Sequence, residues 1–183
     1  VGKVRGAFEL SANRHLGYAC VAGWRADRAA QVEVAHRQAG DYWLKDWLMD
    51  PRRRSTIEMV VGQARGAPSS PTLIALKEAF DDPEDEFNVP VRLLEGPEVP
   101  ASYARIHDWV RDGKVWHFKQ PALNAAAVHG RTKRAGDGKM WDRTGSPVDI
   151  APLVGCSEAL YVLTEESEAP RQSAYAARGL VTV

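Results

Sequence analysis

The sequence is poor in cysteine and has no excess of charge of either sign. Only two of its 183 residues are cysteines, Cys20 and Cys156, and both lie in apolar surroundings without a metal-type spacing. We therefore expect two buried free thiols in a reducing compartment rather than a disulfide. The 24 basic residues equal the 24 acidic residues in number, so only a local patch of charge can attract a polyanion.

Several familiar motifs are also absent. There is no G-x-x-x-x-G-K-[ST] segment, which excludes nucleotide hydrolysis by a P-loop within this sequence, and no G-x-G-x-x-G follows a strand pattern. Ser157 lies in "GCSEA", which is not the G-x-S-x-G turn of a serine hydrolase. The five histidines lack the spacing of zinc ligands. No apolar run reaches the roughly 18 residues of a membrane span, and no signal peptide is visible.

What is present predicts one α/β domain over residues 1–166, followed by a tail or linker over residues 167–183. A hydrophobic content of 44% is enough for one core. The apolar patterns predict a mixed five-stranded sheet with helices on both faces, in which the first three strands form an antiparallel meander and the later strands are parallel. The expected strands are residues 3–10, 16–25, 31–38, 55–62 and 89–96. The expected helices are residues 41–50, 71–80, 99–113, 121–132 and 148–166.

Two acids stand at the ends of predicted elements. Glu9 is near the carboxyl end of the first strand, where ligands gather in open α/β sheets, and Asp149 opens the last helix. If the two carboxylates converge, they form a hard-oxygen site for Mg²⁺ or Mn²⁺. The alternatives are that Asp149 only caps its helix and that Glu9 only faces solvent.

A basic segment precedes Asp149. Residues 128–145 carry five cations against two acids, a local charge of +3, together with several glycines. Glycines and cations suit the close approach of a phosphate backbone, whereas the alternative is an ordinary solvated loop. The cations are Arg131, Lys133, Arg134, Lys139 and Arg143, and the acids are Asp137 and Asp142.

These segments together resemble the nuclease domain of tailed-phage large terminases, in particular those of phages that infect actinobacteria. The run "HFKQPALNAAAVHGRTKRAGDGKMWDRTGSPVDIAPLVGCSEALYV" is similar to the end of that domain. "GAFELSANRHLGYACVAGWR" and "VEVAHRQAGDYWL" are similar to its first three strands and the helix that follows. The resemblance covers the chain to about residue 166 and rests on the order and spacing of the motifs.

The resemblance implies an RNase H-like fold with a metal-dependent endodeoxyribonuclease activity that uses Mg²⁺ or Mn²⁺. In this family the nuclease cuts concatemeric genomic DNA during packaging. The implied partners are double-stranded DNA, an N-terminal ATPase motor domain outside this sequence, the portal and the small terminase. The implied location is the cytoplasm of an infected bacterial host, with no membrane association.

The family's functional residues carry over to specific positions. Glu9 stands where the family has an aspartate, and Asp149 matches its last acid, so both are implied as catalytic residues and metal ligands. Asp137 matches the acid of a "GD" pair and is a further candidate metal ligand. Arg134 and Arg143 match family arginines, and with Lys133 and Lys139 they are the candidate DNA contacts.

One departure from the family affects the predicted site. The second metal-binding acid of the family ends the fourth strand, where this sequence has Gly62 or Gln63. Glu58 precedes Gly62 by four residues, which is roughly 13 Å along a strand. The alternatives are therefore a nuclease with an unusual metal site, or a domain of this fold that binds DNA or the packaging motor and portal without cutting. A resolvase- or transposase-like nuclease is a third alternative.

Overall fold

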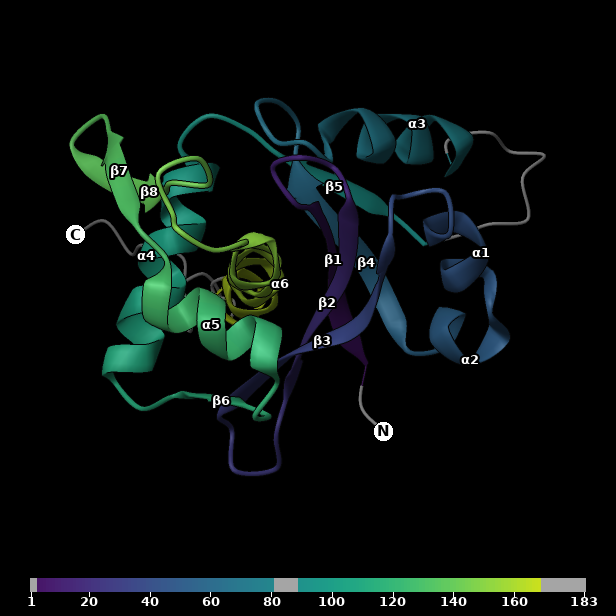
Figure 1. The fold of residues 1–183 in the computed structure, drawn as a ribbon. Coiled ribbons are helices and arrows are strands. Elements are labelled where there is room, and N and C mark those ends of the chain that lie inside the picture. The colour runs from purple at the N-terminus through teal and green to yellow at the C-terminus, as the bar shows by residue number, and fades with distance from the viewer. Residues whose placement is uncertain (1–2, 81–88, 169–183) are drawn as a thin grey trace, which may run out of the picture.

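A computed structural model describes residues 3–80 and 89–168, which form an α/β fold around a six-stranded sheet (Figure 1). The strand order is β5-β4-β1-β2-β3-β6. The predicted antiparallel meander of β1, β2 and β3 is confirmed, and β4, β5 and β6 each pair in parallel with a neighbour. The strands are β1 (Val4–Leu10), β2 (Leu16–Trp24), β3 (Ala30–Ala39), β4 (Ile57–Gln63), β5 (Val91–Leu94) and β6 (Val115–His117).

The prediction of five strands is wrong, because the sheet has a sixth strand, β6, at its edge. The prediction of a loop for the basic segment is also wrong, because part of that segment forms strands. β6 is three residues long and pairs with residues 30–32 of β3, so it is too short to show a periodic pattern. The basic segment contains a two-stranded hairpin of β7 (Thr132–Ala135) and β8 (Gly138–Trp141). The side chains of this hairpin are largely exposed, so its sequence lacks the alternation of apolar and polar residues that predicts a strand. Gly136 allows the turn with a φ of 59°.

Helices cover both faces of the sheet, as predicted (Figure 1). One face carries α4, α5 and α6, and the other carries α1, α2 and α3. The helix predicted over residues 41–50 is present as α1 over residues 44–49, and Pro51 begins a separate short helix directly after it. The helices are α1 (Leu44–Met49), α2 (Pro51–Arg54), α3 (Ser70–Phe80), α4 (Glu98–Arg111), α5 (Pro121–His129) and α6 (Ala151–Glu168).

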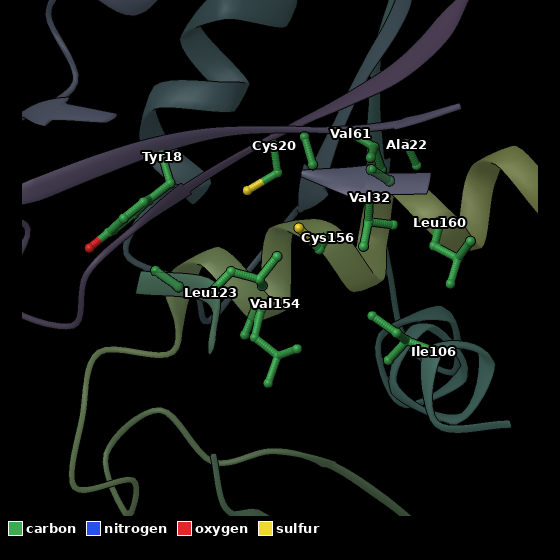
Figure 2. Close-up of a cluster of buried hydrophobic side chains, with 14 of the residues drawn as sticks. Tyr18, Cys20, Ala22, Val32, Val61, Ile106, Leu123, Val154, Cys156 and Leu160 are labelled. Atoms are coloured by element: carbon green, nitrogen blue, oxygen red, sulfur yellow. The ribbon is translucent and has the colours of Figure 1, made fainter. Parts of the chain in front are cut away.

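Helix α6 packs against the central strands and forms the larger of two buried hydrophobic clusters. Figure 2 shows Cys20 of β2 next to Cys156 of α6, within the cluster that also contains Tyr18 and Val154. Both cysteines are buried and free, which confirms the prediction. None of the described helices is long and apolar enough to cross a membrane. Because α6 extends to residue 168 and residues 169–183 lie outside the described part of the chain, the boundary between domain and tail remains a prediction.

Strand alternation decides which side chains of β1 and β4 face α6. Phe8 belongs to the cluster on the α3 side, so Glu9, the next residue of β1, points to the α6 side. A Cβ atom at Gly62 of β4 would lie 2.2 Å from Cδ1 of Leu73 in α3, so position 62 faces α3. Gln63 therefore faces α6, and it is Gln63 that stands where an acid was expected.

Candidate functional site

Glu9 is a wholly buried carboxylate near the carboxyl end of β1, so the solvent-facing alternative for this residue is wrong. Its Oε2 accepts a hydrogen bond of 3.0 Å from the hydroxyl of Ser69, which lies between β4 and α3. Its Oε1 lies 2.8 Å from Nη2 of Arg143. Burying a carboxylate is unfavourable unless it is paired, and these two partners provide the pairing.

Arg143 lies in the turn after β8, and its side chain is only 13% exposed. Burial lowers its pKa, but the charges of Glu9, Glu158 and Asp149 outweigh burial and hold the pKa above the ordinary value for arginine. Neither Nη1 nor Nη2 has a hydrogen-bond partner, so the contact with Glu9 is a close ion pair without hydrogen-bond alignment. The guanidinium predicted to contact DNA is thus turned inward, toward Glu9.

Glu158 of α6 is a second wholly buried carboxyl group at this site, and it was not predicted from the sequence. Its Oε1 accepts a hydrogen bond of 2.8 Å from Nε2 of Gln63, whereas its Oε2 is buried without a hydrogen-bond partner. Burial and the neighbouring Glu9 raise the pKa of Glu158 well above its usual range, against the opposing effect of Arg143. A signal was present: Glu158 is the single charged residue within residues 150–164.

Asp149 is exposed and precedes the first turn of α6. Its Oδ1 accepts a hydrogen bond of 3.0 Å from the backbone N–H of Ala151, the first residue of α6, so Asp149 does contact the helix start. A metal-binding role beyond that contact stays a prediction. Its Oδ2 accepts a hydrogen bond of 2.8 Å from the hydroxyl of Tyr18, which is the β2 residue paired with Glu9. Burial and this hydrogen bond raise the pKa of Tyr18. Tyr18 thereby holds Asp149 beside the end of β1 that carries Glu9.

A surface hollow of about 670 Å³ opens at this end of the sheet. It is lined by Arg143 and Asp149, and by polar side chains of the β1–β2 turn that include Ser11 and Asn13. The hollow therefore gives a solvent-borne ligand access to Asp149 and Arg143, whereas the buried Glu9 and Glu158 are not among its lining residues.

The β7–β8 hairpin holds the other predicted site residues. Lys133, Arg134 and Lys139 are exposed on its strands, and Asp137 lies in its turn. These four residues line a separate hollow of about 390 Å³, on the hairpin that projects past α4 in Figure 1. The structure thus brings Glu9, Arg143 and Asp149 together and keeps Asp137 and the three other cations on the hairpin.

The donor chemistry of the site fits a hard divalent cation. Carboxylate oxygens are the ligands that Mg²⁺ and Mn²⁺ prefer, and Glu9, Glu158 and Asp149 provide them. Glu9 Oε1 and Glu158 Oε2 are buried without hydrogen-bond partners. In residues 3–80 and 89–168, no three acidic, histidine or cysteine side chains are already grouped as a metal site. Arg143 is the cation that contacts Glu9 in this structure.

The fold around this site is that of the nuclease domain of phage large terminases, which confirms the fold expected from the sequence resemblance. The nuclease of thermophilic phage G20c with bound magnesium aligns with a TM-score of 0.58 and 12% identity, covering 86% of this chain and 80% of that one. The cobalt-bound form of the same nuclease aligns with a TM-score of 0.54.

The HK97 bacteriophage large terminase aligns with a TM-score of 0.56 and 14% identity. The alignment covers 88% of this chain but 40% of the HK97 protein, so this chain spans less than half of that terminase. No protein-family model and no curated protein matches the sequence. At these identities the structural likeness establishes the fold.

The raised pKa of Glu158 leads to a prediction about stability and pH. Because the folded state holds the Glu158 proton more tightly than the unfolded state, this group stabilises the fold at low pH and that stability is lost as the pH rises. The loss is about 1.4 kcal/mol for each pH unit in which only the folded state is protonated. Glu158→Gln, which cannot ionise, is expected to gain stability relative to wild type between pH 5 and pH 8, measured by urea unfolding.

Glu165→Gln is the matched control on the same helix. The hydrogen bond from Arg92 lowers the pKa of Glu165, so its carboxylate stabilises the fold above its unfolded pKa, and this variant should lose stability near neutral pH. Parallel pH profiles for Glu158→Gln and the wild type would show that Glu158 ionises normally.

Proposed function

We propose that this chain is the nuclease domain of a DNA-packaging large terminase and that it hydrolyses DNA phosphodiester bonds with the help of Mg²⁺ or Mn²⁺. The observation that carries the proposal is the convergence of Glu9 and Asp149 at one end of the central sheet, linked through Tyr18. The likeness to the magnesium-bound and cobalt-bound G20c nuclease supports the use of a divalent cation.

The residues of the site have distinct tasks in this proposal. Glu9 and Asp149 would hold the metal, which when bound supplies an acidified water and neutralises charge on the scissile phosphate. Ser69 fixes the orientation of the Glu9 carboxylate, and Tyr18 fixes that of Asp149. Because Asp149 lines the open hollow, a DNA strand can approach its carboxylate from solvent.

The DNA backbone would lie along the β7–β8 hairpin, where Lys133, Arg134 and Lys139 are exposed. Nζ of Lys133 lies 3.9 Å from Oδ1 of Asp142. That distance is too long for a hydrogen bond, so the lysine ammonium remains available to phosphate. Exposed cations on a narrow projecting element suit contacts to phosphates rather than to bases.

Replacing Arg134 and Lys139 with glutamine together is expected to weaken DNA binding to the same degree for unrelated sequences. The slope of log K against log salt should fall by about 0.9 for each phosphate that the variant no longer neutralises. Fluorescence anisotropy with a labelled duplex at several salt concentrations measures both quantities.

The matched control is the double variant Arg28→Gln and Arg52→Gln, which removes two exposed cations from the β2–β3 turn and from α2. An unchanged slope of log K against log salt for the hairpin variant would show that the hairpin does not contact DNA. An equal change of the slope in the control variant would show the same.

The proposal extends to the assembly in which such a domain works. It includes an ATPase motor on the same polypeptide, double-stranded concatemeric DNA as substrate, the portal and small terminase as partners, and the cytoplasm of an infected bacterium as the location. A Walker motif in the parent gene tests the first of these and separates a terminase from a resolvase- or transposase-like nuclease.

A second candidate function is DNA or motor binding without cleavage. Gln63 in place of an acid and the ion pair of Arg143 with Glu9 favour it, because both lower the negative charge available to a metal. In that case the chain binds DNA with the salt dependence described above but leaves plasmid DNA intact in every metal.

A further inference from the structure

Two buried oxygen atoms from different elements lack hydrogen bonds at the same site. They are Oε1 of Glu9 on β1 and Oε2 of Glu158 on α6. Oε1 of Glu9 is 2.8 Å from Nη2 of Arg143 without hydrogen-bond alignment, and Glu158 lies close enough to Glu9 for that carboxylate to raise the pKa of Glu158. The two oxygens therefore belong to one cluster of buried charges, and such a cluster can be completed by an ion.

The helix is close to the sheet here because of Gly155. A Cβ atom at this position would lie 2.8 Å from Sγ of Cys20 and 3.6 Å from Cγ of Glu9. Any larger residue would push α6 away from β1 and β2. Glycine thus lets α6, and with it the Glu158 carboxyl group, approach the end of β1.

Gln63 connects this arrangement to the acid that β4 lacks. Its amide Nε2 donates to Oε1 of Glu158, so the residue at the end of β4 orients a carboxyl group that comes from α6. The amide of Gln63 is uncharged, whereas the carboxyl group of Glu158 to which it donates can carry a negative charge. The second acidic group is therefore present at the site, although it comes from a different element.

We propose that Glu158 is the second carboxylate ligand of the site and that, with Glu9, it binds Mn²⁺ or Mg²⁺ when Arg143 withdraws. This inference rests on the proposed function, since it concerns the same site. Once a bound cation displaces the Glu158 proton, the two carboxylates together carry a charge of −2, which a divalent cation balances and one guanidinium does not. Arg143 belongs to a turn and its terminal nitrogens make no hydrogen bonds, so little holds it in place beyond the ion pair with Glu9.

Calorimetric titration with Mn²⁺ tests the inference on the wild type, Glu158→Gln and the control Glu165→Gln. Glu158→Gln should bind Mn²⁺ about tenfold or more weakly than the wild type, and Glu165→Gln should bind as the wild type does. Equal affinity in the wild type and Glu158→Gln would overturn the assignment, and so would a wild type that binds no Mn²⁺ at millimolar concentration.

Crystals of the wild type soaked in Mn²⁺ give a second test that needs no variant. Anomalous density is expected within about 2.0–2.6 Å of carboxylate oxygens of both Glu9 and Glu158. Density that contacts Glu9 and Asp149 but not Glu158, or that lies only on surface acids, would overturn the assignment.

Plasmid nicking by the same variants separates this inference from the proposed function. Mn²⁺ affinity that depends on Glu158 without any nicking would support the metal site and contradict the nuclease. Nicking with unchanged Mn²⁺ affinity in Glu158→Gln would support the nuclease and overturn the role of Glu158.

Discussion

Replacing Arg143 with methionine is expected to destabilise the fold by about 3–5 kcal/mol. Methionine keeps the apolar stem but removes the positive charge that contacts the buried Glu9 carboxylate. The site would then contain the buried carboxyl groups of Glu9 and Glu158 without a neighbouring cation. Breaking a buried ion pair in this way leaves the charge of Glu9 uncompensated. Urea unfolding at pH 7 measures the loss.

Two comparisons make this result specific. Arg111→Met removes an exposed arginine that pairs with Asp108 and Asp112 at the end of α4, and such a solvent-exposed pair contributes little to stability. Adding Glu158→Gln to Arg143→Met should restore part of the lost stability at pH 7, because glutamine removes the free-energy cost of keeping the Glu158 carboxyl group protonated beside Glu9. A loss below about 1 kcal/mol for Arg143→Met would contradict the arrangement of charges described above.

Replacing Asp149 with asparagine is expected to lower DNA cleavage by about 100-fold or more while leaving the fold intact. Asparagine keeps an oxygen that can accept from the N–H of Ala151, and the Tyr18 hydroxyl can turn to accept from the amide. The negative charge needed for a metal is lost. The assay is nicking of supercoiled plasmid, with the melting temperature as the check on folding.

Asp137→Asn is the matched control for this variant, since it removes one carboxylate from the turn of the hairpin rather than from the hollow at the end of β1. Cleavage should continue in that variant. Equal activity in Asp149→Asn and the wild type would show that Asp149 only caps its helix. Loss of activity in Asp137→Asn would show that Asp137 is needed for cleavage and would favour it as a metal ligand.

The sheet and the helix order followed from the sequence because their periodic patterns are long. Glu9 and Asp149 could be selected as candidate site residues because each stands at the end of such a pattern, where ligands bind in open α/β sheets. The short β6 was not counted among the strands of the sheet, and the hairpin was not predicted, because strands of three or four residues leave no periodic signal.

Burial within the site could not be read from the local sequence. Arg143 is one of five cations in a polar segment, and only the tertiary fold shows that it points inward to Glu9. Glu158 stood out as the single charged residue within residues 150–164, but the local sequence does not show that its carboxyl group meets Gln63 and Glu9. The choice between Gly62 and Gln63 depended on which face of β4 meets α3, and the close approach of Leu73 to Gly62 decides it.

Nicking of supercoiled plasmid by the purified wild-type chain, in Mn²⁺, Mg²⁺ or EDTA, tests the central claim most directly. The proposed nuclease should nick the plasmid in Mn²⁺ or Mg²⁺ and leave it intact in EDTA. Intact plasmid in both metals, from a chain that is folded and still binds DNA, would contradict the nuclease and favour a domain that holds DNA without cutting it.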